Sequence, residues 1–156
     1  MASKRALSTA TPPGVAGLPR QAPFVSGGDA HHGFELYADK AKHILKMRLW
    51  GLWDPPMAVQ FRDGVVKLGR ELKLDSRGAP WAILADSRAF VAQSNEVTNI
   101  RKAAMHEATS LGCTRIAALV DKAVYTMQFR RITNESHMAS AVFGDEASAL
   151  RWLLEP

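Results

Sequence analysis

WAILAD, residues 81–86, is an unbroken apolar run that ends in an acidic residue. A run of this length without alternation is typical of a strand buried on both faces, as in a parallel sheet covered by helices. The stretch RIAALVD, residues 115–121, repeats the pattern. Strands that alternate with helical segments favour parallel pairing through right-handed crossovers, so these two runs predict the centre of an α/β sheet.

Two further strands are predicted before the first run. Residues 34–39 and residues 44–53 each alternate apolar with polar side chains. Such alternation is typical of strands with one wetter face, and the polar residues between the two stretches predict an antiparallel hairpin. Asp54 and Pro55 then predict a helix start, because Asp can accept hydrogen bonds from the first amide groups and Pro fits the first helical position.

The segments that follow complete the order of elements. Ser94 or Asn95 can cap a second helix, and Asp145 can cap a final one. Between them, a third helix is predicted around residues 124–134 and a short strand at 140–143. The sequence therefore predicts an α/β domain with a mixed five-stranded sheet, in the order β-β-α-β-α-β-α-β-α, and helices packed on it.

Residues 1–33 differ from the rest of the chain. They are rich in Pro, Gly, Ser, Thr and Ala and show neither helical nor strand periodicity. Three basic residues and one acidic residue give the segment a charge of +2, out of +5 for the whole chain. A segment of this composition buries too little apolar area to offset the entropy of ordering. We therefore expect a disordered basic tail over 1–33 and a domain over 34–156, with the boundary near Gly33.

The composition narrows the class of protein. Apolar residues make up 47% and charged residues 22% of 156 residues, which suits one globular domain. The single cysteine, Cys113, excludes an internal disulfide, and the longest apolar runs are far shorter than the roughly 20 residues of a membrane span. No secretory signal is recognisable. We expect a cytoplasmic protein without a membrane span, and we do not expect nucleic acid as a partner, because basic and acidic residues mix along every predicted helix.

Four stretches resemble the STAS-like, or SpoIIAA-like, family of small bacterial regulatory domains. They are LWGLW (49–53), GAPWAILAD (78–86), RIAALVD (115–121) and VFGDEASALRWL (142–153). The resemblance covers about residues 34–155, and its motifs are packing and turn patterns rather than catalytic signatures. It implies a STAS-like fold and a regulatory role.

The pair Asp86-Ser87 is similar to the switch of the anti-sigma-factor antagonists in that superfamily. In those proteins a serine that follows an Asp at the end of the central strand is phosphorylated, so the resemblance implies that Ser87 is a phosphorylation site. Phosphate beside Asp86 would add about two negative charges and repel or recruit a partner. This chain continues with Arg88, where those antagonists have another small residue. The alternative is that Ser87 is a turn serine bound to its own backbone.

Asp86 and Asp121 end the two predicted parallel strands. That edge of an open α/β sheet is where ligands tend to bind. Two carboxylates there could hold Mg²⁺ or serve in acid–base chemistry, and the alternative is that each caps the turn that follows it. No glycine-rich phosphate loop accompanies them in the sequence.

Trp50 and Trp53 belong to a group of aromatic residues in the first three predicted strands, with Phe34, Tyr37 and Trp81. Side chains on opposite faces of a strand cannot all enter one core. Part of this group could therefore form an exposed surface for a partner or an apolar ligand. The alternative is that the rings pack under the first and last helices.

These observations lead us to expect a non-enzymatic regulatory or adaptor domain that needs no cofactor and acts through protein–protein interaction. Asp86, Ser87, Arg88 and Asp121 mark the expected contact region, and a homo-oligomer is compatible with the sequence. Two alternatives stay open. One is a binder of an apolar or lipid-like ligand between the first helix and the sheet, and the other is a small Mg²⁺-dependent enzyme that uses Asp86 and Asp121.

Overall fold

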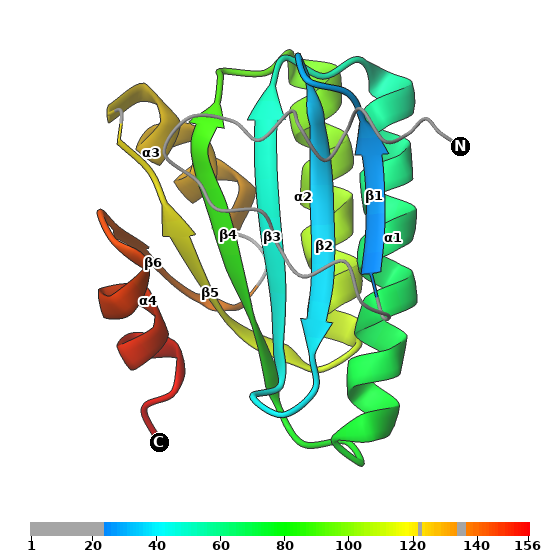
Figure 1. The fold of residues 1–156 in the computed structure, drawn as a ribbon, viewed down its shortest axis with the longest axis vertical. Coiled ribbons are helices and arrows are strands. Elements are labelled where there is room, and N and C mark those ends of the chain that lie inside the picture. Colours follow the sequence, from blue (N-terminus) through cyan, green and yellow to red (C-terminus); the bar gives the residue numbers. More distant parts are fainter. Residues whose placement is uncertain (1–23, 122, 134–136) are drawn as a thin grey trace.

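The computed structural model describes residues 24–121, 123–133 and 137–156. The strands are β1 (Phe24–Gly28), β2 (Gly33–Asp39), β3 (Ile44–Gly51), β4 (Trp81–Phe90), β5 (Cys113–Leu119) and β6 (Ala139–Phe143), and the helices are α1 (Pro55–Asp75), α2 (Asn95–Ser110), α3 (Ala123–Thr133) and α4 (Glu146–Leu153). The strands form one sheet in the order β1-β2-β3-β4-β5-β6 (Figure 1). α1, α2 and α3 cover one face, and α4 packs over β4 and β5 on the other. No helix in these ranges is long and apolar enough to cross a membrane.

The sheet is mixed, as predicted, but it has six strands rather than five. β1, β2 and β3 pair antiparallel, and β3 to β6 pair parallel. The additional strand is β1, which lies within the segment predicted as tail. Its FVSGG stretch is too short and too rich in glycine to predict a strand by itself, yet each of its residues pairs with one in β2. The boundary predicted near Gly33 is therefore wrong and moves at least to Phe24, while residues 1–23 lie outside the described residues.

β4 is longer than the run that predicts it. The expected strand ended at Asp86, but β4 continues to Phe90. A register shift against β3 lets the two strands stay paired as far as Gly51 and Phe90. Ser87 and Arg88 therefore lie within a strand and not in the loop that the sequence suggested.

α1 begins and packs as predicted. Asp54 caps the helix, because its Oδ1 atom accepts a hydrogen bond from the amide of Met57 at 3.0 Å. A Cβ atom at Gly64 would lie 2.8 Å from Cδ1 of Leu36, so glycine at this position lets the helix approach the sheet closely. One buried stripe on the helix faces the sheet: Phe61, Val65, Leu68 and Leu72.

The core between α1 and the sheet is aromatic. Between ring centroids, Trp53 lies 5.9 Å from Phe34, 5.1 Å from Phe61 and 4.7 Å from Phe90. The rings are tilted or edge-on to one another, which is the arrangement that aromatic pairs prefer. Trp53 and Trp50 are both buried, so the alternative of an exposed aromatic surface is wrong for these two residues.

Candidate functional site

Two loops meet at the carboxyl end of the parallel strands. Residues 52–54 connect β3 to α1, and residues 91–94 connect β4 to α2. The loops start side by side, because Gly51 and Phe90, the last residues of β3 and β4, are register partners. Gly51 has a φ of 76°, a left-handed conformation that glycine adopts without strain and that turns the chain out of the strand.

Gln93 ties the two loops together. Its Oε1 atom accepts a hydrogen bond from the amide of Trp53 at 2.8 Å, and its Nε2 atom donates to the carbonyl oxygens of Gly51 at 3.0 Å and Val91 at 2.7 Å. The Gln93 side chain is buried, so these hydrogen bonds are shielded from water and costly to leave unmade. The two loops therefore form one fixed structure.

Two apolar side chains stand on this fixed structure. Leu52 is 59% exposed and Val91 is 40% exposed. Single exposed apolar residues are common, but these two directly follow the register partners Gly51 and Phe90, and exposed apolar residues on adjoining loops suit contact with a partner. We call this pair the Leu52/Val91 surface. Sequence reasoning missed it, although an apolar residue directly after each predicted strand end was a signal that could have found it.

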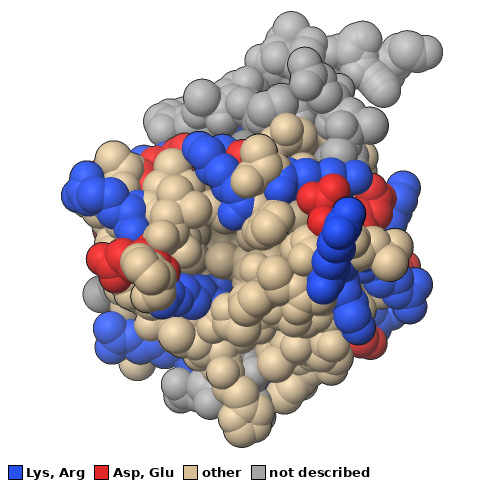
Figure 2. Space-filling model, turned by 90° about the horizontal axis from the view of Figure 1, so that it is seen from below, with Lys and Arg blue, Asp and Glu red and all other residues tan. Residues whose placement is uncertain are grey.

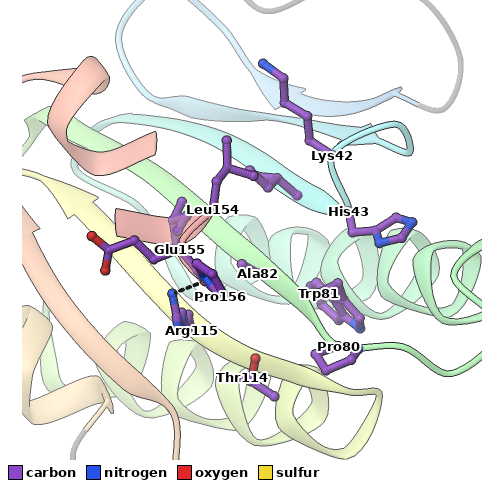
Figure 3. A pocket seen from close by; sticks show the side chains of 12 residues that line it. Lys42, His43, Pro80, Trp81, Ala82, Thr114, Arg115, Leu154, Glu155 and Pro156 are labelled. Carbon is purple, nitrogen blue, oxygen red and sulfur yellow. Dashed lines mark hydrogen bonds between the residues drawn. The ribbon is translucent and has the colours of Figure 1, made fainter. Parts of the chain in front are cut away.

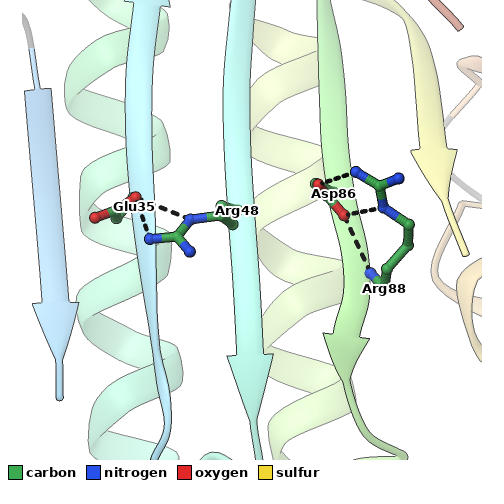
Figure 4. A network of polar contacts seen from close by, with 4 residues as sticks. All are labelled: Glu35, Arg48, Asp86 and Arg88. Carbon is green, nitrogen blue, oxygen red and sulfur yellow. Dashed lines mark hydrogen bonds and ion pairs between the residues drawn. The ribbon is translucent and has the colours of Figure 1, made fainter. Parts of the chain in front are cut away.

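Asp86 and Arg88 form an ion pair within β4 (Figure 4). Nε of Arg88 donates to Oδ1 of Asp86 at 3.0 Å, and Nη2 of Arg88 donates to Oδ2 of Asp86 at 2.8 Å. Hydrogen bonding to Asp86 raises the pKa of Arg88 above its ordinary value, and the negative charges of Asp86, Glu146 and Asp121 add to the effect. Both oxygens of the Asp86 carboxylate are thus engaged by arginine.

The structure does not bring the two expected Mg²⁺ ligands together as a metal site. Asp86 is engaged by Arg88, and Asp121 lies beyond the end of β5 at an exposed position. In the part of the chain that the structure describes, no three His, Cys, Asp or Glu side chains gather where they could hold a metal ion. Asp121 acts on the Asp86–Arg88 pair through the electrostatic attraction between its carboxylate and Arg88.

Ser87 points to the other face of β4. It is 3% exposed and lines a cavity of about 20 Å³ together with Met47, Arg101 and Met105. Because this cavity lies beneath the helices, a phosphate group can reach the Ser87 hydroxyl only if β4 opens locally. Phosphorylation of Ser87 stays a prediction, and the structure adds this opening as a requirement.

A second ion pair lies on the same sheet face as Asp86 (Figure 4). Glu35, Arg48 and Asp86 are register partners across β2, β3 and β4. Oε1 of Glu35 accepts hydrogen bonds from Nη2 of Arg48 at 2.7 Å and from Nε of Arg48 at 3.0 Å, and both residues are buried. The guanidinium of Arg48 also lies 4.8 Å from the centre of the Trp50 ring. This row fixes the register of the strands, because a slip of one residue would move the charges into the apolar core.

A hollow of about 340 Å³ lies at the opposite end of the sheet (Figure 3). Lys42 and His43 of the β2–β3 hairpin line one side, and Arg115 lines the other. Figure 2 shows this end of the molecule, where Lys and Arg side chains stand around a hollow. Nη1 of Arg115 donates to the carbonyl oxygens of Trp152 at 2.7 Å and Glu155 at 3.0 Å. Arg115 therefore holds the chain at the end of α4 in place, which is a structural role.

Comparison with known proteins bears on the fold. No protein-family model matches the chain, and no curated protein matches it. Among solved structures, it is similar to an uncharacterised protein of the DUF3478 family with a SpoIIAA-like fold, from Shewanella loihica PV-4. The similarity has a TM-score of 0.59 and 15% sequence identity, and it covers 81% of this chain and 98% of that protein. The chain therefore has the SpoIIAA-like fold that its sequence indicates.

Proposed function

We propose that this chain is a non-enzymatic regulatory or adaptor domain that binds a protein partner through the Leu52/Val91 surface. The observation that carries the proposal is the pair of exposed apolar side chains on two loops that Gln93 holds together. Loops whose backbone is already held by Gln93 lose little conformational entropy on binding, and contact of Leu52 and Val91 with a partner removes apolar area from water. These features suit a protein contact.

The expected polar residues support a binding role over a reaction. Asp86 and Arg88 engage one another, and Ser87 is buried on the other face of β4. A reaction site needs an acid, a base or a nucleophile that can reach a substrate. None of these three side chains offers such a group to a molecule that approaches the Leu52/Val91 surface.

The charges beside the Leu52/Val91 surface suggest what its partner carries. Asp54 caps α1 and Glu96 lies in the first turn of α2, and both are exposed. They give the apolar pair an acidic rim. Since complementary charges steer association and orient partners, we expect the bound surface of the partner to combine an apolar centre with Lys or Arg residues.

The packing of the core supports a protein contact over the alternative of an apolar ligand between α1 and the sheet. The rings of Trp53, Phe34 and Phe61 occupy that space. The cavity beside Ser87 has a volume of about 20 Å³, which suits a single water molecule, whereas sites for small molecules have volumes of about 300–1,000 Å³. The groove of about 300 Å³ between β1 and α1 has Asp63 and Lys67 in its lining, which suits an apolar ligand poorly, so a lipid under α1 would require the aromatic core to open.

Affinity purification from the native cell tests the proposal. We place the protein in the cytoplasm, which its single buried cysteine supports, so the purification starts from the cytoplasmic fraction. The wild type is compared with the double variant Leu52→Asp/Val91→Asp. We expect a stoichiometric protein partner with the wild type and its loss with the double variant, because two carboxylates in the contact cannot be desolvated without cost.

Leu74→Asp is the matched control. Leu74 is 79% exposed, but it lies in the last turn of α1, at the other end of the molecule. This variant adds the same kind of charge without touching the Leu52/Val91 surface, so it should keep the partner. A partner that the double variant retains, or the lack of any stoichiometric partner with the wild type, would contradict the proposal.

A further inference from the structure

β1 is an edge strand, and no other strand in the described ranges pairs with its outer side. It runs antiparallel to β2, from Phe24 opposite Tyr37 to Gly28 opposite Gly33, without a register shift. Proteins usually protect such an edge with Lys, Pro or a bulge, because its backbone can otherwise pair with another chain. The β1 sequence, FVSGG, has none of these features.

The backbone groups of Ser26, at the centre of β1, point away from β2. In an antiparallel ladder, residue pairs that exchange hydrogen bonds alternate with pairs that do not. In the turn after β1, the amide of Asp29 donates to the carbonyl oxygen of His32 at 2.9 Å. Asp29 and His32 therefore form a hydrogen-bonded pair, and the alternation makes Gly27 and Val25 members of such pairs with Phe34 and Leu36. Ser26 lies between Gly27 and Val25, so its N–H and C=O face away from β2.

A hydrogen bond on the other side of the ladder leads to the same result. The amide of Ala82 in β4 donates to the carbonyl oxygen of His43 at 3.0 Å. The backbone N–H and C=O groups of His43, Leu45 and Met47 therefore face β4. The backbone groups of Arg48 therefore face β2, and those of its register partner Glu35 face β3. In β1, the register partner of Glu35 is Ser26. Because the backbone groups of Glu35 face β3, those of Ser26 point away from the sheet.

A groove runs beside this edge. It lies between β1 and α1 and has a volume of about 300 Å³. Gly27 and Gly28 carry no side chains, so another strand can approach the edge closely at these positions. The groove is lined by Val25, Ser26, Phe34, Gln60, Asp63, Gly64 and Lys67.

We propose that a second copy of this chain pairs with β1, antiparallel and centred on Ser26. Two-fold symmetry then places Ser26 opposite Ser26 of the second copy, and each N–H donates to the C=O of the other. Phe24 lies opposite Gly28 and Val25 lies opposite Gly27, so each large side chain meets a glycine. The result is one continuous sheet across two chains, formed without the Leu52/Val91 surface.

The charges on α1 fit the same two-fold arrangement. Asp63 and Lys67 both line the groove and are one helical turn apart. An antiparallel copy reverses their order, so the Asp63 end of one helix comes towards the Lys67 end of the other. This matching of opposite charges favours a second copy over an unrelated extended peptide.

A single cysteine introduced at Ser26 tests the pairing directly. In a hydrogen-bonded antiparallel pair the two Cα atoms lie about 5.5 Å apart, within the range that a disulfide spans. We expect Ser26→Cys to give a disulfide-linked dimer under mild oxidation. The native Cys113 does not interfere, because it is buried and burial raises the pKa of its thiol to about 12. The matched control is Ala139→Cys, on the opposite edge strand β6 at an exposed position, which should stay unlinked.

Light scattering provides a second measurement that needs no cross-link. The wild type should have twice the chain mass of 17.1 kDa at high protein concentration, and Ser26→Pro should have the mass of one chain with an unchanged circular dichroism spectrum. Pro is tolerated here because the N–H it removes faces away from β2. A wild type with the mass of one chain, or a Ser26→Cys variant that links no faster than Ala139→Cys, would overturn the proposal.

Discussion

The two faces of the sheet bury their side chains in different ways. Under α1 the face is aromatic, with Trp53 in contact with three other rings. The opposite face carries the Glu35–Arg48 and Asp86–Arg88 ion pairs beside the apolar patch under α4. Buried apolar area stabilises a fold strongly, whereas the attraction in a buried ion pair is largely offset by desolvation. The comparison teaches that stability resides mainly on the aromatic face, and that the charged face determines which strands pair in which register.

Removal of the central ring should give the largest effect. Trp53→Ala leaves a cavity among Phe34, Phe61 and Phe90 and also removes the indole N–H that donates to the carbonyl oxygens of Gly33 and Trp50. We expect the free energy of unfolding to fall by about 3–5 kcal/mol, measured by urea denaturation. The comparison of the two faces breaks down if the loss is under about 1 kcal/mol.

The charged face should respond differently to single and double changes. Glu35→Leu leaves the buried guanidinium of Arg48 without its carboxylate, and we expect a loss of about 3 kcal/mol in the free energy of unfolding. Glu35→Leu/Arg48→Leu removes both charges and should regain most of that loss. If the double variant is as unstable as the single one, the pair contributes net stability and the difference between the faces is smaller than proposed.

The smallest effect near neutral pH concerns the titration of Cys113, because its thiol is protonated there in both the folded and the unfolded state. Burial raises the pKa of the Cys113 thiol from 9.0 to about 12, because the charged thiolate is poorly solvated in the core. The folded state therefore holds its proton where the unfolded state releases it, so stability is fully present below pH 9.0 and falls as the pH rises towards about 12. Cys113→Ala should lose this part of the pH dependence in denaturation curves. If the free energy of unfolding of the wild type and of Cys113→Ala depended on pH in the same way above pH 9.0, the thiol would be solvated in the folded state.

Patterns within one element were readable from the sequence. The apolar runs predict β4 and β5, and the Asp54-Pro55 pair predicts the start of α1, because each signal depends on neighbouring residues alone. β1 was missed because its five residues become a strand only through pairing with β2. The position of Ser87 was wrong for a related reason, since pairing with β3 extends β4 past Asp86.

The candidate site depends on contacts between distant parts of the chain. Gln93 binds the backbone of Gly51 and Trp53, which are about forty positions earlier in the sequence. No local sequence pattern predicts such contacts. The exposure of Leu52 and Val91 likewise follows from where two paired strands end in space. The sequence placed Asp86 at the end of a strand, but β4 continues past it to Phe90, and no local pattern predicted its engagement by Arg88.

Hydrogen exchange on the complex with the co-purified partner tests the central claim most directly. The account predicts that the partner slows exchange of the amides in residues 52–54 and 91–94, the two loops that Gln93 joins. It also predicts unchanged exchange around Leu74, at the far end of α1. Protection confined to other segments, with both loops exchanging as in the unbound protein, would contradict binding through the Leu52/Val91 surface.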